Sequence, residues 1–198
     1  MTMLRMLALG ISGPGLLVLA ACAHAADDAP PAAAPVTRAE VLARALARAA
    51  EAEAAGEQTS AAGSAQARAV SLVDRLGARA LDGGEDPVPA WRSAAVHADP
   101  VMRGRPLGPG YRSGRIPAGR SESFAQLFLS GTGASITLSA PNGGRVAMRV
   151  IDPQAKTVCK GEANRAGTCR WVPLFTQRYT IEVANLGQED ARYFLVVD

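Results

Sequence analysis

The 198-residue chain has few of the residues on which most enzymes and metal sites depend. It contains two histidines, three cysteines and 5% aromatic residues, so zinc sites and histidine acid–base chemistry have few candidates. Neither a GxSxG nucleophile motif nor a GxxxxGK phosphate loop is present. His97 stands without a nucleophile in sequence, which favours an ordinary loop imidazole over a catalytic one. We therefore expect no catalytic residue, no metal ion and no cofactor.

Net charge and long apolar runs are scarce as well. The formal net charge of +3, with 20% charged residues, is too small for a dedicated nucleic-acid binder, so no nucleic-acid partner is expected. Apart from the N-terminal apolar run, no apolar segment approaches the roughly 18 residues that a membrane span needs, which excludes a multi-spanning membrane protein. The 48% hydrophobic residues suit one compact domain with extensions.

The N-terminus has the pattern of an export signal. Residues 1–21 carry one positive charge, Arg5, before an apolar stretch that glycine and proline interrupt. The sequence Leu19-Ala20-Ala21-Cys22 resembles the lipobox of bacterial lipoproteins, in which the Cys22 thiol receives a diacylglyceryl group. We therefore expect a periplasmic protein, held as an outer-membrane lipoprotein by a lipid anchor on Cys22. The alternative is ordinary cleavage after Ala25, which yields a secreted or soluble periplasmic protein.

An alanine- and proline-rich tether, residues 22–36, follows the signal. At about 3 Å per residue, the segment from Ala23 to Val36 could hold a domain roughly 40 Å from a membrane. Charge then divides along the chain, because residues 26–95 carry seven basic and ten acidic residues, whereas residues 96–198 carry thirteen and eight. The two parts could attract each other.

Residues 37–82 are expected to form a helical arm. Thr37 and Glu40 form a capping-box motif, and apolar residues recur at three- and four-residue steps up to Gly56. A second helix is expected over residues 64–81, closed by glycines. Both apolar stripes are thin, which favours a loosely packed spacer; a hairpin that leans on the C-terminal domain or on a partner is the alternative.

A linker rich in proline, glycine and arginine is expected at residues 83–113, where the sequence shows almost no apolar period. Arginine guanidinium groups match phosphate and carboxylate geometry, so this region offers candidate contacts to an acidic glycan, with a solvated face as the alternative. The candidates are Arg103, Arg105, Arg112 and Arg115.

From Ser121 the apolar period changes from 3.6 to 2, with turn-forming residues between the runs. Short strands at this spacing favour a mainly β fold, an antiparallel jelly-roll-like β-sandwich over residues 114–198, preceded by the helical hairpin arm. Trp171, Phe175 and Tyr179 could present a flat apolar patch, but Tyr179 and Phe175 are expected in the core. Trp171, next to Pro173, is a candidate for binding a sugar ring or a protein.

Two cysteines flank a polar loop that contains glycines. If their neighbours pair as a hairpin, Cys159 and Cys169 can form a disulfide in an exported protein. A metal site is the weaker alternative, because the sequence has no CxxC and its histidines are distant.

Five segments together resemble the bacterial pre-peptidase C-terminal domain family: Arg115–Gly119, the alternating strand up to Leu129, Val146–Lys156, Tyr179–Val183 and Arg192–Val197. The resemblance covers Gly114 to Asp198. It implies a jelly-roll-like β-sandwich and a secreted, non-catalytic module that binds matrix, glycan or a companion protein. Basic residues replace the family's Asp-x-Asp near Arg145 and Arg149, so calcium binding is not expected.

The sequence thus predicts a non-catalytic cell-envelope protein, a binding or structural module for an envelope glycan or an exported protein. The alternative is an accessory or inhibitor subunit of an exported hydrolase, which docks through the helical arm.

Overall fold

The computed structural model describes residues 36–56, 60–94, 108–163 and 167–198, all within one compact unit. The predicted signal peptide, Cys22 and the tether up to residue 35 lie outside these residues, as do His97, Arg103 and Arg105. No helix of the described segments is long and apolar enough to cross a membrane.

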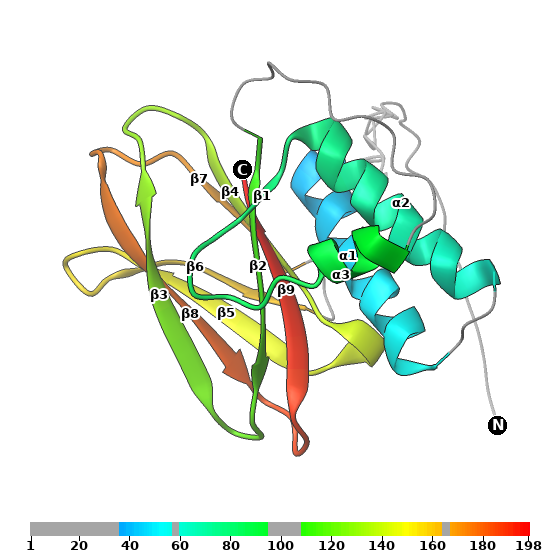
Figure 1. The fold of residues 1–198 in the computed structure, drawn as a ribbon. Helices are drawn as coiled ribbons and strands as arrows, with labels where there is room; N and C mark the ends of the chain where they lie inside the picture. The colour runs from blue at the N-terminus through cyan, green and yellow to red at the C-terminus, as the bar shows by residue number, and fades with distance from the viewer. Residues whose placement is uncertain (1–35, 57–59, 95–107, 164–166) are drawn as a thin grey trace, which may run out of the picture. The chain divides into compact units, whose positions relative to one another are not determined.

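Two β-sheets form a sandwich, which confirms the predicted fold class (Figure 1). Sheet A has the strand order β1-β2-β9-β4-β7, and sheet B has the order β3-β8-β5-β6. All pairs are antiparallel except β1 with β2. The strands are β1 (Arg79–Ala80), β2 (Gly110–Ile116), β3 (Ser121–Phe128), β4 (Ala134–Ser139), β5 (Val146–Ile151), β6 (Thr157–Glu162), β7 (Gly167–Trp171), β8 (Gln177–Asn185) and β9 (Ala191–Val197).

The helical segments are α1 (Arg38–Ala54), α2 (Ser60–Leu76), α3 (Val88–Ala94) and a short 3-10 turn, η1 (Pro141–Gly143). Helix α1 begins with the predicted capping box, since Thr37 and Glu40 satisfy each other's backbone N–H groups. Helix α2 ends five residues before its predicted end. Gly77 adopts φ +61°, and the N–H of Ala78 donates to the carbonyl of Val73, which is a Schellman termination.

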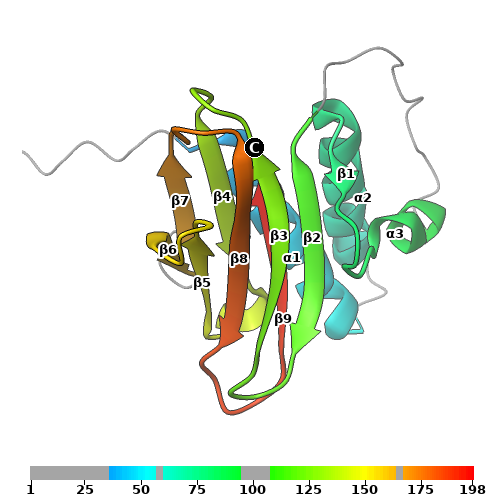
Figure 2. The ribbon, with the colours of Figure 1, turned by 90° about the vertical axis from the view of Figure 1, so that its left-hand side faces the viewer.

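The helices form a third layer over sheet A (Figures 1 and 2). Helix α1 lies along β4 and β9, and both of its leucines and most of its alanines are buried. Strand β9 is therefore covered on both faces. Tyr193, Leu195 and Val197 face the core between the sheets, whereas Phe194 and Val196 pack against the helices. A strand covered on both faces explains the continuous apolar run at the end of the chain.

The sequence favoured a loosely packed spacer for residues 37–82. In the structure, α1 and α2 instead pack against sheet A. Small alanines let α1 approach the sheet closely, and β9 supplies the large apolar side chains that the helices lack. Segment 83–113 also contains regular structure, namely α3 and most of β2. Trp91 of α3 is 2% exposed and packs against Phe194, with ring centroids 6.3 Å apart.

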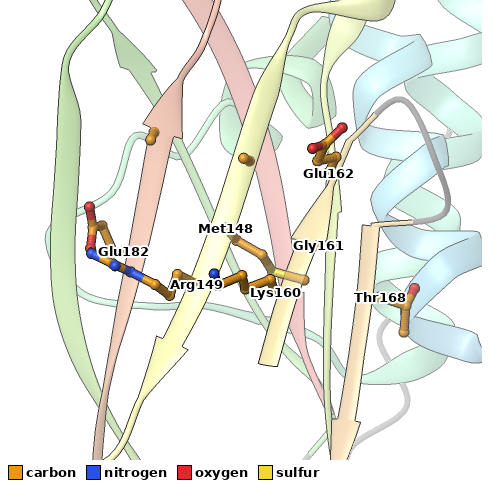
Figure 3. Close-up of a pocket in the computed structure, with 9 residues that line it drawn as sticks. Met148, Arg149, Lys160, Gly161, Glu162, Thr168 and Glu182 are labelled. Carbon is orange, nitrogen blue, oxygen red and sulfur yellow. The ribbon is translucent and has the colours of Figure 1, made fainter. Parts of the chain in front are cut away.

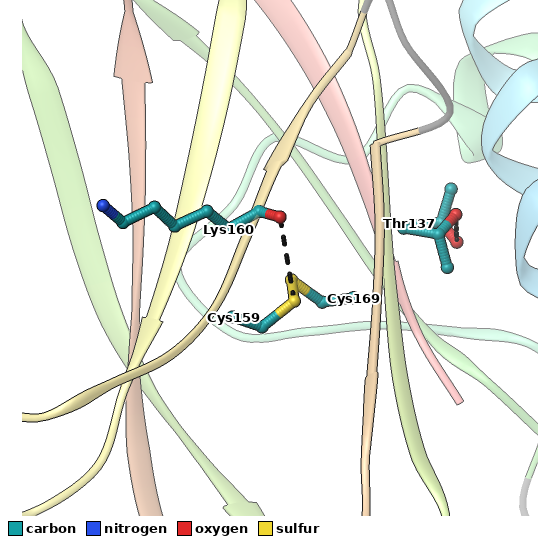
Figure 4. Close-up of a disulfide and its surroundings, with 5 residues drawn as sticks. Thr137, Cys159, Lys160 and Cys169 are labelled. Carbon is teal, nitrogen blue, oxygen red and sulfur yellow. Dashed lines mark hydrogen bonds between the residues drawn. A yellow bond between two sulfur atoms is a disulfide. The ribbon is translucent and has the colours of Figure 1, made fainter.

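The predicted disulfide is present, but its two cysteines do not lie on a paired hairpin: β6 and β7 belong to different sheets, and the bridge joins these sheets at one edge. Cys159 of β6 and Cys169 of β7 are bonded, with Cα atoms 5.8 Å apart (Figure 4). Thr137 lies on the opposite side of β7 from the disulfide and shares a hydrogen bond of 3.1 Å with Thr168. The bridge therefore closes the sandwich on the β6–β7 side.

Candidate functional site

Strands β3 and β7 end at the same end of the sandwich (Figures 1 and 2). Large apolar side chains are exposed there. We name this set the apolar tip. Its members come from the end of β3, the β3–β4 connection and the β7–β8 connection, and they are between 46% and 81% exposed. The apolar tip consists of Leu127, Leu129, Val172, Leu174 and Phe175.

The two loops of the apolar tip are hydrogen-bonded to each other. The Ser130 backbone N–H donates to the Thr176 hydroxyl at 3.0 Å, and the Ser130 hydroxyl donates to the Leu174 carbonyl at 3.0 Å. The Gly131 N–H donates to the Pro173 carbonyl at 2.9 Å, in a turn where Gly131 has φ +71°. Three bonds between the loops hold the apolar side chains on a preorganised surface.

Phe128, Trp171 and Tyr179 form an aromatic cluster next to the apolar tip. Trp171 packs edge-on against Phe128 at 4.8 Å between ring centroids and lies 5.6 Å from Tyr179. Tyr179 is buried, as predicted, but Phe175 is 69% exposed and not in the core. Phe175 lies in the β7–β8 connection, outside the alternating register that carries side chains inward. The Trp171 ring, expected as a binding surface, thus packs against Phe128 and Tyr179. Phe175 is instead the ring exposed to solvent.

A cavity of about 620 Å³ lies beside the apolar tip and shares Val172 with it. Trp171 lines this cavity, and its indole N–H is buried without a hydrogen-bond partner within the described part of the chain. Charged groups stand at the same place, where Arg38 and Asp198 form an ion pair at 3.3 Å. The cavity therefore adds polar groups next to an apolar surface.

Glu40 fastens the start of α1 to β7 near this cavity. Its carboxylate accepts hydrogen bonds from the Thr168 hydroxyl at 2.8 Å and from Arg170 at 3.3 Å. Burial acts to raise the pKa of Glu40, but the bonds from Thr168 and the Thr37 backbone, with the charge of Arg170, outweigh burial and lower the pKa. The carboxylate is thus ionised and structural.

A second cavity, of about 640 Å³, lies on the outer face of sheet B (Figure 3). Small residues, including Ala147, Gly161 and Ala184, line it together with charged side chains. Arg149 forms an ion pair with Glu182, and Lys160 and Glu162 stand on the neighbouring strand. Charges of both signs and the lack of an aromatic ring among its lining residues make it a weaker candidate for recognition than the tip.

Two of the four predicted arginines are described, and they lie in different surroundings. Arg112 is only 11% exposed and stacks over Phe124 at 4.5 Å. Its Nε donates to the Tyr193 hydroxyl at 3.2 Å, and the Tyr193 hydroxyl in turn donates to Glu122. Arg112 is therefore committed to contacts within the sandwich. Arg115 is exposed and lines a polar cavity at the end opposite the tip.

The buried hydroxyl of Tyr193 belongs to this same network. Burial raises its pKa above the ordinary value, and the hydrogen bond to Glu122 acts in the same direction. Tyr111 behaves alike, since burial and its hydrogen bond of 2.9 Å to Asp86 raise its pKa. Both tyrosines are hydrogen-bond donors that hold the fold together.

Within residues 36–56, 60–94, 108–163 and 167–198, no three histidine, cysteine or acidic side chains gather in a way that could hold a metal ion. Sequence reasoning missed the exposure of Leu129 and Leu174, and it favoured the core over an exposed apolar patch for Phe175. The signal was present, because the short segment between β7 and β8 carries three large apolar residues where a connecting loop is usually polar.

No protein-family model and no curated protein matches the chain. Three solved structures with a similar fold each cover less than half of it. The pre-peptidase C-terminal domain of a Bacillus anthracis collagenase is 15% identical with a TM-score of 0.40, covering 44% of this chain and 87% of that one. The Aeromonas hydrophila periplasmic inhibitor of g-type lysozyme is 14% identical with a TM-score of 0.37, covering 46% and 84%. A mitogen derived from Yersinia pseudotuberculosis is 10% identical with a TM-score of 0.40, covering 46% and 84%. None of these similarities identifies a function.

Proposed function

We propose that the protein is an exported, non-catalytic binding module of the cell envelope, and that it binds through the apolar tip. The exposure of the tip carries this proposal. Leu174 is 81% exposed and Phe175 is 69% exposed, on loops that are hydrogen-bonded to each other. Soluble proteins rarely leave a contiguous group of large apolar side chains in water unless that group contacts something.

The size of the tip suits a contact surface. Covering the exposed parts of its five side chains would contribute about 5–9 kcal/mol, from about 1.5–3 kcal/mol for each fully buried side chain. Association itself costs about 4–15 kcal/mol, so the tip needs help from its surroundings. The adjacent cavity, with the ion pair between Arg38 and Asp198, offers a polar rim to such an apolar centre.

The location in the envelope rests on the sequence. The predicted export signal and the lipobox ending at Cys22 direct the chain out of the cytosol. The disulfide between Cys159 and Cys169 agrees with an oxidising compartment. A lipid-anchored, disulfide-bonded domain that acts by contact fits all three features.

The structure gives less support to docking through the helical arm. The apolar stripe of α1 is already used against sheet A, since Leu42 and Leu46 are fully buried. A partner would have to displace the helix from β9 to reach that stripe. An accessory or inhibitor role through the tip remains compatible with the same chemistry, because inhibitors also bind by contact.

Crosslinking in the living cell tests the proposal. A photoreactive phenylalanine analogue replaces Leu174 in one chain and Leu186 in a matched control, because Leu186 is 46% exposed in the β8–β9 turn at the other end. We expect adducts of protein, glycan or lipid from position 174 and not from position 186. Equal adduct formation at both positions, or none at 174, would contradict binding through the tip.

A pair of substitutions supplies the second arm of the experiment. Leu174→Ser and Phe175→Ser remove the exposed apolar surface and leave the loop hydrogen bonds, because those use backbone carbonyls and the Ser130 and Thr176 side chains. We expect thermal unfolding to be unchanged and envelope association to fall. Unchanged association would show that the tip is not the binding surface.

A further inference from the structure

The N-terminal segment joins the described domain beside the apolar tip. Thr37 and Arg38 line the same cavity as Thr132 and Val172, and α1 runs from there to the opposite end, where Glu53 pairs with Arg192. Val36, the first described residue, is 59% exposed. Whatever holds the preceding segment therefore holds the domain by the end that carries the tip.

The two ends of the sandwich differ in chemistry. The cavity at the far end is polar, lined by charged side chains that include Arg115, Arg145, Glu189 and Asp190. Leu186 is the large exposed apolar side chain near that end among the described residues. An apolar surface is thus concentrated at the end where the tether enters.

Arginines surround the apolar tip. Arg178 is exposed and stands opposite Leu127 in the β3–β8 register. Arg38 and Arg170 lie at the adjacent cavity, with side chains 69% and 44% exposed. Asp198 and the buried Glu40 pair with Arg38 and Arg170, which leaves Arg178 as the exposed cation beside Leu127. An apolar centre with exposed arginine side chains at its edge complements the acyl chains and the phosphate headgroups of a bilayer surface.

We propose that the apolar tip inserts into the headgroup–acyl boundary of the membrane leaflet to which the chain is tethered. The inference rests on the proposed function, because it names the partner of the same surface. The tether from Ala23 to Val36, at about 3 Å per residue, is long enough for the domain to reach the leaflet, and it enters beside the tip. The tip then meets the bilayer with an insertion depth of about 5–10 Å.

Quenching by brominated lipids tests this placement in the full exported chain, purified with its N-terminus as the cell leaves it. Phe175→Trp places a fluorescent ring at the tip, and Leu186→Trp places the matched control at the far end. Each protein is reconstituted with vesicles of phosphatidylethanolamine and phosphatidylglycerol whose acyl chains are brominated near the headgroup. The unmodified chain supplies the background emission of Trp91 and Trp171.

We expect the added emission of Phe175→Trp to shift to the blue and to be quenched, and that of Leu186→Trp to do neither. Adding Leu174→Asp to Phe175→Trp should abolish the quenching, because a carboxylate at the tip opposes insertion. No quenching at position 175, or equal quenching at both positions, overturns the membrane contact. If quenching is absent while position 174 still crosslinks to an envelope protein, binding through the tip stands and the bilayer is the wrong partner. If quenching at position 175 and crosslinks at position 174 are both absent, the membrane contact and the proposed function are both wrong.

Discussion

The side chain that fastens the helical layer to the sandwich is Glu40, and its removal should destabilise the protein more than the loss of any surface ion pair. Glu40 is 7% exposed. One carboxylate oxygen accepts from Thr168 and Arg170, and the other accepts from the Thr37 backbone N–H at 3.2 Å. Glu40→Ala would remove all three bonds and leave the Thr168 hydroxyl and the Thr37 N–H without that acceptor.

The magnitude follows from these bonds. Loss of the capping interaction costs about 1 kcal/mol, and hydrogen bonds to a charged group contribute about 1.5–3 kcal/mol. Arg170 is 44% exposed, so its share is discounted for solvent screening. We expect Glu40→Ala to lower the free energy of unfolding by about 2–4 kcal/mol, which is about 5–12 °C in Tm for a domain of this size. Glu40→Gln keeps an acceptor oxygen and should cost about 1 kcal/mol.

The effect should also depend on pH. The pKa of Glu40 is lowered in the folded protein, so its charged form stabilises the fold above the ordinary value of 4.5, and this contribution is lost as pH falls through the folded pKa. The difference in unfolding free energy between the parent chain and Glu40→Gln should therefore shrink in acid. Urea unfolding followed by circular dichroism at several pH values measures it.

A matched control lies on the same helix. Glu53 is 42% exposed and pairs with Arg192 at 2.9 Å, so Glu53→Ala should cost less than about 1 kcal/mol. If Glu40→Ala costs no more than Glu53→Ala, or if the pH dependence runs the other way, the carboxylate does not fasten α1 to the sheet as argued.

Three further outcomes follow from the structure. Replacing Cys159 and Cys169 by serine should lower the free energy of unfolding by about 3 kcal/mol in urea, the chain-entropy value for a loop of this length; an unchanged midpoint would argue that the bridge adds nothing. Trp91→Ala should cost about 3–5 kcal/mol, because the ring is buried against the sheet; a loss under about 1 kcal/mol would mean that α3 is not docked. The raised pKa values of Tyr111 and Tyr193 mean that their hydroxyl bonds stabilise the fold below the ordinary value of 10.0 and are lost well above it. Tyrosinate absorbance from these two should then rise together with unfolding in alkali, and ionisation of both in the folded state would refute the burial argument.

Strand alternation made much of the sandwich predictable, but β2 was missed for a physical reason. Its inward side chains are not a simple apolar series. Arg112 satisfies its charge against Glu122 and Tyr193, and Gly114 lies under the Tyr193 ring, where an added Cβ would come within 2.9 Å of that ring. A strand held by an internal polar network and by a close approach to a ring carries no period in the sequence.

The helical layer shows a different limit. The sequence of α1 contains its own cap, which was predicted, but the surface that it covers is contributed by Phe194 and Val196, more than a hundred residues away. The alternation at Tyr193, Leu195 and Val197 predicted the face of β9 that packs between the sheets. The residues between them form the opposite face, whose burial becomes evident only when the helices that cover it are seen. The alanine stripe of α1 can pack only because Phe194 and Val196 form the other face of β9. The local sequence of α1 does not predict that contact.

The position of the candidate site follows from which surfaces the fold leaves open. Sheet A is covered by sheet B on one face and by helices on the other, and the outer face of sheet B carries paired charges such as Arg149 with Glu182. The two ends remain, and only one of them gathers large apolar side chains in the described structure. That end is also where the chain enters from its N-terminal segment. An anchor at Cys22 would attach the domain at the end that carries the tip, and replacing the apolar residues of the tip by polar ones should abolish the contact even with the anchor intact.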